Sequence, residues 1–278
     1  MTSRALPLSG TCSAALIFAA SLLAGCGANK PVTLSSPPGS TANITGNWEL
    51  TANTTVGQAS IGVYLTSNAG SVWGIAVGPL GTDNIAFGDG CVGSPIGPFG
   101  AEALTGTVDA DGNLKLGPPA SGSPESFTMT STVSGSTVSN GSFSLNCVST
   151  VKGTITGTEY PPLEGTYSGT VTSQVTGQSF TMSATLDQSS APNSDGYLGL
   201  TGTVGVTGYP CISSAAMPIS SNFVGNEFWA GLNPAPNATL GWAGTLSPDG
   251  KTLAIGYGFT LNGSGCNGDF GTGTLTLQ

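Results

Sequence analysis

The chain has 278 residues, of which 44 are glycine and only 7% are charged, and it contains no histidine. Its formal net charge of −9 excludes the basic surface that phosphate recognition requires, so no nucleic acid is expected as a partner. The lack of histidine excludes Ser-His-Asp and Cys-His catalysis. An apolar content of 38% with little charge separates the chain from disordered proteins, so we expect an exported all-β protein.

Residues 1–25 have the features of a cleaved signal peptide. Arg4 lies in a short n-region, and the apolar segment 13–25 is too short to remain as a membrane-spanning helix. The segment ends in Leu23-Ala24-Gly25-Cys26, which resembles the lipobox of bacterial lipoproteins. The resemblance implies that Cys26 becomes the lipidated N-terminus, carrying a thioether-linked diacylglycerol and an N-acyl chain such as palmitate. The alternative is an ordinary secretory signal that ends near a cysteine.

Several acyl chains on one residue make a stable membrane anchor. Gly27, which follows the lipobox, implies by the same resemblance an outer-membrane location, at the periplasmic face or the cell surface. Cleavage leaves four lysines against fourteen carboxylates, a formal net charge of −10, so charge does not assist membrane attachment. Residues 26–43 are rich in Pro, Ser and Gly and are predicted to be a flexible tether with a span of about 20–25 Å.

The rest of the chain reads as one unit written twice. Ile44-Thr45-Gly46-Asn47-Trp48 opens the first copy, and Leu163-Glu164-Gly165-Thr166-Tyr167 opens the second, 119 residues later. The consecutive prolines at 161 and 162 do not continue a β-ladder, so we place the boundary between the copies near residue 161. The predicted domains are 44–160 and 163–278.

Within each copy the apolar residues recur with a period of two, as in 61–65 and 180–187, which indicates strands with one buried face. Asp111-Gly112 and Asp249-Gly250 lie between such runs, where tight hairpins require them. We expect eight strands in the first copy at about 45–54, 59–66, 71–78, 103–109, 113–117, 126–133, 136–145 and 150–158. The second copy has eight at about 164–173, 178–188, 197–206, 216–224, 226–233, 238–247, 252–261 and 269–278.

Eight antiparallel strands in chain order can close into an up-and-down barrel, which removes exposed sheet edges. The predicted fold is therefore two tandem barrels. One cysteine of each copy follows the third strand and another follows the seventh, at the same barrel end. We expect the disulfides Cys91–Cys147 and Cys211–Cys266, because an exported protein is oxidised; other pairings require contact between copies. Each closes roughly 55 residues and contributes about 4 kcal/mol.

The opening Gly46-Asn47-Trp48 resembles the Gly-x-Trp start of lipocalins and avidin-like proteins, with Gly165-Thr166-Tyr167 in its place in the second copy. The resemblance implies a small calycin-like barrel. It carries over no ligand. Lipocalins pack that tryptophan against a basic residue, and the mature chain has no arginine and no equivalent lysine; the polar and partner-subunit aromatic groups of biotin binding do not match this sequence residue by residue.

Catalytic chemistry would depend on carboxylates or lysines, and sequence alone does not reveal which carboxylates pair in space. Asp109-Ala110-Asp111-Gly112-Asn113 resembles a fragment of a calcium loop, but it lacks the later bidentate glutamate, and hairpin turns use the same residues. We predict a turn here, and no catalytic residue, metal site or cofactor in the chain.

The aromatic residues are the positions where a ligand would be held. An eight-stranded barrel is either filled by its own side chains or encloses one small ligand, and we favour a filled interior. The residues that would line a ligand are Trp48, Trp73, Tyr167, Trp229, Trp242 and Tyr257.

Three functions follow from these features. The leading one is a lipid-anchored envelope protein with a non-catalytic structural or surface-interaction role, whose protein or small-molecule partner is unknown. The first alternative is a binding module for a small apolar or carbohydrate ligand inside a barrel. The second is a carboxylate-dependent hydrolase, which requires two carboxylates to converge in a cleft.

Overall fold

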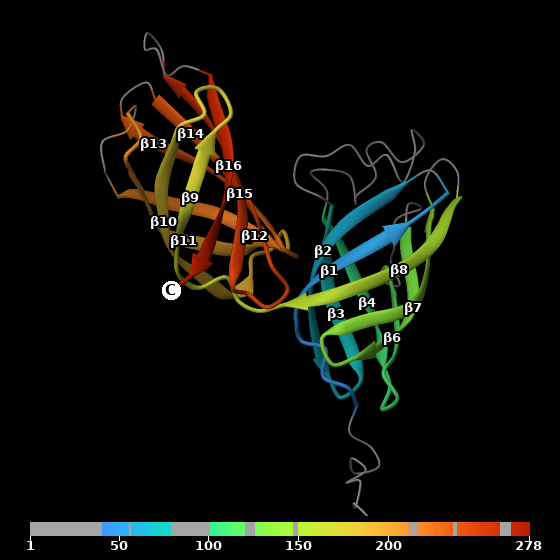
Figure 1. Ribbon diagram of the computed structural model, residues 1–278. Coiled ribbons are helices and arrows are strands. Elements are labelled where there is room, and N and C mark those ends of the chain that lie inside the picture. Colours follow the sequence, from blue (N-terminus) through green and yellow to red (C-terminus); the bar gives the residue numbers. More distant parts are fainter. Residues whose placement is uncertain are drawn as a thin grey trace, which may run out of the picture. The chain divides into compact units, whose positions relative to one another are not determined.

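The computed structural model describes residues 41–55, 57–78, 101–119, 126–146, 150–210, 212, 216–235, 238–261 and 268–278. All regular secondary structure in these ranges is β-strand, and the strands form two closed antiparallel barrels of eight (Figure 1). The predicted all-β fold of two tandem barrels is confirmed. Within the described ranges there is no helix of the length and apolar character needed to cross a membrane.

The first barrel is a meander in which β1 pairs with β2 on one side and with β8 on the other, closing the sheet. Trp48 of β1 lies opposite Val63 of β2 and Glu159 of β8. The strands are β1 (Gly46–Asn53), β2 (Gln58–Asn68), β3 (Ser71–Val77), β4 (Ala101–Val108), β5 (Asn113–Gly117), β6 (Ser126–Ser134), β7 (Thr137–Asn146) and β8 (Thr150–Tyr160).

The second barrel repeats this order and closes between β16 and β9, where Leu277 lies opposite Tyr167. Figure 1 shows it from the yellow β9 to the red β16. The strands are β9 (Gly165–Ser173), β10 (Ser179–Pro192), β11 (Leu198–Thr207), β12 (Met217–Val224), β13 (Glu227–Ala235), β14 (Ala238–Leu246), β15 (Thr252–Leu261) and β16 (Asp269–Leu277).

The strands lie where the alternating pattern places them. The largest difference is at the end of β10, which runs to Pro192 although the pattern predicts an end at residue 188. Its register against β11 shifts between Gln188 and Pro192, so an irregular extension follows the alternating part. An irregularity of this kind leaves no period-two signal in the sequence.

Large inward-facing side chains are buried in the interior of each barrel. Close packing of large apolar groups is the main favourable contribution to folding, at about 1.5–3 kcal/mol for each large side chain fully buried. The largest buried side chains are Trp48, Phe127, Leu50, Ile61 and Leu65 in the first barrel, and Trp242, Tyr167, Phe223, Phe228 and Phe259 in the second.

Glycine is required where strands approach closely. A Cβ on Gly153 of β8 would collide with the carbonyl oxygen of Asn53 on β1, and a Cβ on Gly202 of β11 would collide with that of Thr185 on β10. Part of the high glycine content therefore serves tight barrel closure.

All six cysteines lie outside the described residues, so the two disulfides remain predictions. The observed topology does place the C-terminal ends of β3 and β7 at the same end of the first barrel. The C-terminal ends of β11 and β15 likewise share one end of the second barrel.

Candidate functional sites

The six aromatic residues predicted to line a ligand divide into two groups. Trp48, Tyr167, Trp242 and Tyr257 are buried inside the barrels, with exposed fractions of 0%, 1%, 0% and 5%. Trp73 on β3 and Trp229 on β13 are instead 46% and 61% exposed, because strand alternation turns them to the outer face. These two tryptophans do not line an interior.

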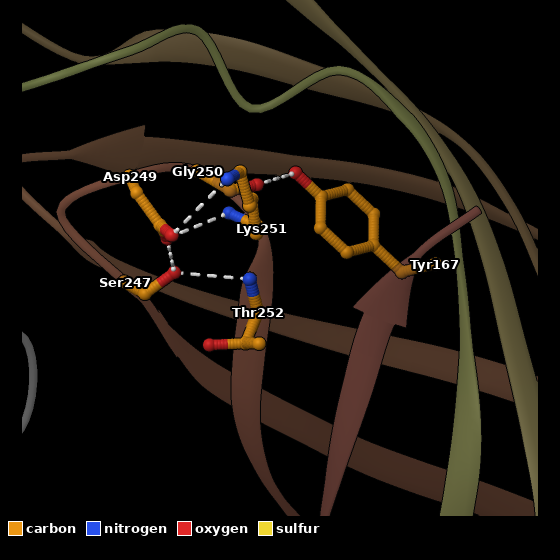
Figure 2. Close-up of polar contacts among 6 residues, drawn as sticks. All are labelled: Tyr167, Ser247, Asp249, Gly250, Lys251 and Thr252. Carbon is orange, nitrogen blue, oxygen red and sulfur yellow. Dashed lines mark hydrogen bonds and ion pairs between the residues drawn. The ribbon is translucent and has the colours of Figure 1, made fainter.

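The aromatic residue that opens each barrel hydrogen-bonds its polar end to a backbone carbonyl. The Nε1–H of Trp48 donates to the Ile44 carbonyl at 3.1 Å. The Oη–H of Tyr167 donates to the Gly250 carbonyl at 2.8 Å, as Figure 2 shows. Since Gly250 belongs to the turn between β14 and β15, Tyr167 ties the first strand of its barrel to a turn between two strands with which it does not pair. The Gly-x-aromatic opening thus has a structural role in both copies.

The turn reached by Tyr167 is held by its own polar side chains. Asp249 Oδ1 accepts the Ser247 hydroxyl at 2.7 Å and the Lys251 amide at 3.1 Å, while Ser247 Oγ accepts the Thr252 amide at 2.9 Å (Figure 2). Ser247 and the Lys251 amide lower the pKa of Asp249. Asp249 therefore caps a turn, as its place beside glycine predicts.

A buried carboxylate lies at the opposite mouth of the second barrel. Asp269 is 6% exposed and accepts three hydroxyls, from Ser173 at 2.6 Å, Tyr209 at 2.5 Å and Tyr257 at 3.0 Å. Burial raises its pKa, but these hydrogen bonds outweigh burial and hold the pKa below its ordinary value. Burial and the bond to Asp269 raise the pKa of Tyr257 to about 12. The carboxylate is ionised at neutral pH and its acceptors are occupied, so it pins strand ends together.

The corresponding mouth of the first barrel also carries a buried carboxyl group. Glu102, at the start of β4, is 7% exposed and accepts the Phe127 amide at 3.3 Å on Oε1. Its Oε2 has no hydrogen-bond partner among the described residues. Burial is the main cause that raises the pKa of Glu102, and the Phe127 amide opposes it. The buried carboxyl at this mouth therefore accepts three hydroxyls in the second barrel but one backbone amide in the first.

The calcium-like residues form a turn between β4 and β5. Asp109 Oδ1 accepts the amides of Asp111 and Asn113 at 3.0 and 2.8 Å, and its Oδ2 accepts the Asn113 side chain at 2.8 Å. Gly112 has a φ of 80°, which favours glycine. Among the residues that the structure describes, no group of three or more His, Cys, Asp or Glu side chains could hold a metal ion.

The barrels contact one another through the turn between β12 and β13. Asn47, 4% exposed on the outer face of β1, donates from Nδ2 to the Gly225 carbonyl at 2.6 Å. Its Oδ1 accepts the Gly225 amide at 2.8 Å, so one side chain satisfies both backbone groups of that residue. Val224 beside it packs on Ile75 and Val77 of β3. Because both ends of the Asn47 amide pair with one residue, the two bonds fix the geometry of this contact.

Glu49 lies two residues beyond Asn47 on the same face and is 7% exposed. Its pKa is raised to about 7, first by burial and then by the negative charge of Glu227, against hydrogen bonds from Ser60 and the Asn226 amide. Its Oε1 has no partner among the described residues. Gly225 has a φ of 60°, which favours glycine at that turn, and a Cβ there would also meet the Glu49 carboxylate.

A groove of about 670 Å³ lies beside this contact. It combines three carboxylates, two tyrosines, three prolines and several hydroxyl and amide groups from both barrels. Its lining residues are Thr45, Gly46, Asn47, Tyr64, Ser136, Glu159, Tyr160, Pro161, Pro162, Glu164, Gln188, Ser189, Ser190, Pro248 and Asp249.

Sequence reasoning did not identify this groove, because its walls come from distant segments of both copies. The only signal was the Pro161-Pro162 pair, which marks the boundary between them.

The fold defines the class of protein as a tandem of small closed antiparallel barrels, compatible with the calycin-like barrels that the Gly46-Asn47-Trp48 opening resembles. Comparison with models of protein families, with curated proteins and with solved structures finds no match to this chain.

Proposed function

We propose that this protein is an exported, lipid-anchored envelope protein with a non-catalytic structural or surface-interaction role. The observation that supports the proposal best is that each barrel interior is occupied by its own largest side chains, with Trp48 and Trp242 fully buried. The chain then has its outer surface and its groove left for contact with a partner. The same proposal includes a lipid anchor on Cys26, which would hold the protein at the cell envelope.

The state of the carboxylates is consistent with a non-catalytic role. Asp269 is saturated by three hydroxyl donors, and Asp249 is engaged in its turn. The hydrolase alternative requires a carboxylic acid and a carboxylate paired across a substrate. Glu159 is the groove carboxyl whose burial raises its pKa, so it is the acid that this alternative would use.

A second candidate, the ligand-binding barrel, is favoured by one specific observation. The Nε1–H of Trp242 is fully buried in the second barrel and has no hydrogen-bond partner among the described residues. A buried donor without an acceptor costs about 1–3 kcal/mol, which a water or a small ligand with an acceptor atom would relieve. In the first barrel, Trp48 has the Ile44 carbonyl instead.

Native mass spectrometry separates these candidates. The Cys26→Ser protein is recovered from the envelope of its own host, and its native mass is compared with its denatured mass. We expect the native and the denatured mass to be equal. Both should be lower than the mass of the reduced chain by the hydrogens that two disulfides remove. A stoichiometric extra mass that is lost on denaturation would establish the ligand-binding barrel in place of the surface role.

A further inference from the structure

The groove between the barrels is strongly one-sided in charge. Glu159, Glu164 and Asp249 line it, and no lysine or arginine is among its lining residues. Among the described residues, Lys251 pairs with one of these carboxylates, its Nζ lying 3.9 Å from Asp249 Oδ2. Both side chains are largely exposed, at 72% and 60%, so this ion pair neutralises the groove weakly. A cleft lined by one sign of charge concentrates ligands of the opposite sign.

The carboxylates are spread along the groove. No group of three metal-ligating side chains gathers here or elsewhere in the described ranges. Glu159 is at the end of β8, Glu164 precedes β9, and Asp249 lies in the turn between β14 and β15. Separated negative charges suit an extended ligand with several positive charges better than they suit a single ion.

The groove walls between the carboxylates carry aromatic and apolar groups that suit the methylene stem and charged group of a lysine or arginine side chain. Tyr64 and Tyr160 supply aromatic rings, and Pro161, Pro162 and Pro248 supply apolar surface. Cationic side chains bind over tyrosine rings and lay their methylene stems along apolar surface. The Gln188 side-chain amide group and the Ser190 hydroxyl add polar groups to the wall, while the Ser189 hydroxyl already bonds to Ala191 and Gly199.

Hydrogen bonds made by several of the lining residues hold the groove in shape. Asn47 clamps Gly225 with two hydrogen bonds. The Tyr64 hydroxyl donates to the Ser190 carbonyl at 3.4 Å, and the Asn226 side chain donates to the Tyr160 hydroxyl at 3.4 Å. Because the walls are tied together without a ligand, little ordering has to accompany binding.

We propose that this groove binds an extended segment of a partner protein rich in lysine or arginine. The inference rests on the surface-interaction role and adds the chemistry of the partner. A second copy of this chain does not meet that requirement, because the mature protein carries a formal net charge of −10. Charge complementarity of this kind determines partner choice and the rate of association.

The test uses the full mature chain with Cys26→Ser and a fluorescein-labelled hexalysine peptide, read by fluorescence anisotropy at low salt. The groove variant combines Glu159→Gln, Glu164→Gln and Asp249→Asn. The matched control combines Asp111→Asn, Asp187→Asn and Asp195→Asn, which removes the same charge from exposed positions outside the groove. We expect the groove variant to lose affinity by about tenfold or more and the control to change by less than about twofold.

Equal losses in the two variants would show attraction to net charge alone and would overturn the proposal. Absence of peptide binding, or preferential binding of a glucosamine oligomer, would also overturn it. Should the triple variant fold poorly, Glu164→Gln alone, at an exposed position, serves as the groove variant and is expected to weaken binding in the same direction. None of these outcomes changes the mass comparison that tests the surface role, so the two proposals fail separately.

Discussion

Replacement of Glu49 by glutamine is expected to stabilise the protein at neutral and alkaline pH. The Glu49 carboxyl is 7% exposed and one of its oxygens lacks a partner among the described residues. Burial is the main cause that raises its pKa from 4.5 to about 7, and the nearby charge of Glu227 adds to it. Glutamine has nearly the same shape, stays neutral and keeps an oxygen for the Ser60 and Asn226 donors.

The sign and size follow from the two pKa values. Between pH 4.5 and about 7 the folded protein retains a proton on Glu49 that the unfolded chain releases, so the free energy of unfolding falls as pH rises. Above pH 7 the folded protein must hold the buried carboxylate in its charged form. The full difference between the two pKa values corresponds to about 3 kcal/mol. Glu49→Gln should therefore match the parent below pH 4.5 and exceed its stability by up to about 3 kcal/mol at pH 8.

Urea unfolding followed by tryptophan fluorescence at pH 4.5, 6 and 8 measures this difference. Glu102, another carboxyl with a raised pKa, is present in both proteins and cancels in the comparison. Asp187→Asn, at an exposed position of β10, controls for the loss of one negative charge. A stability difference that stays constant across these pH values would refute the assignment of a raised pKa to Glu49.

Three further predictions concern the anchoring contacts. Tyr167→Phe removes the hydrogen bond to the Gly250 carbonyl and should lower the free energy of unfolding by about 1 kcal/mol, measured by urea titration; an unchanged midpoint would contradict the contact. Asp269→Asn removes the ionised acceptor of the Tyr209 hydroxyl and should cost about 2 kcal/mol at pH 7. Because the pKa of Asp269 is lowered on folding, its contribution is present above pH 3.8 and is lost as pH falls through the lower value, so the parent but not the variant should show this acid dependence. Cys26→Ser should release the protein from membranes and abolish acyl mass; membrane attachment that persists without acyl mass would disprove the lipoprotein assignment.

The strands were predictable because a barrel wall with one buried face imposes a period of two on every strand. Phe180, Met182 and Ala184 follow this rule, and the turn at Asp109–Asn113 follows from hydrogen bonding by a short carboxylate. The alternation that predicts a strand does not by itself say which aromatic residues lie on its buried face. Strand alternation places Trp73 and Trp229 on the outer face, although their aromatic character suggested a ligand-lining role.

The candidate sites were less predictable, because they depend on residues that approach only in the folded chain. Asp269 meets Ser173 and Tyr209 at distances of 96 and 60 residues in sequence, and Asn47 meets Gly225 at 178. Nothing local to Glu49 distinguishes it from an exposed strand carboxylate, since its burial comes from a turn of the other barrel. Pairing across such separations leaves no periodic signal in a single sequence.

The contact between the barrels depends on residues that differ between the two copies. The two barrels have similar folds, so residues that differ between them can make contacts that a single barrel lacks. The first copy places Asn47 and Glu49 on the outer face of β1, whereas the corresponding positions of β9 hold Thr166 and Ser168. The amide and the carboxyl thus occur in the copy that receives the turn at Gly225. A groove that depends on this contact requires both barrels, and exchange of Asn47 and Glu49 for Thr and Ser should loosen it while leaving each barrel core intact.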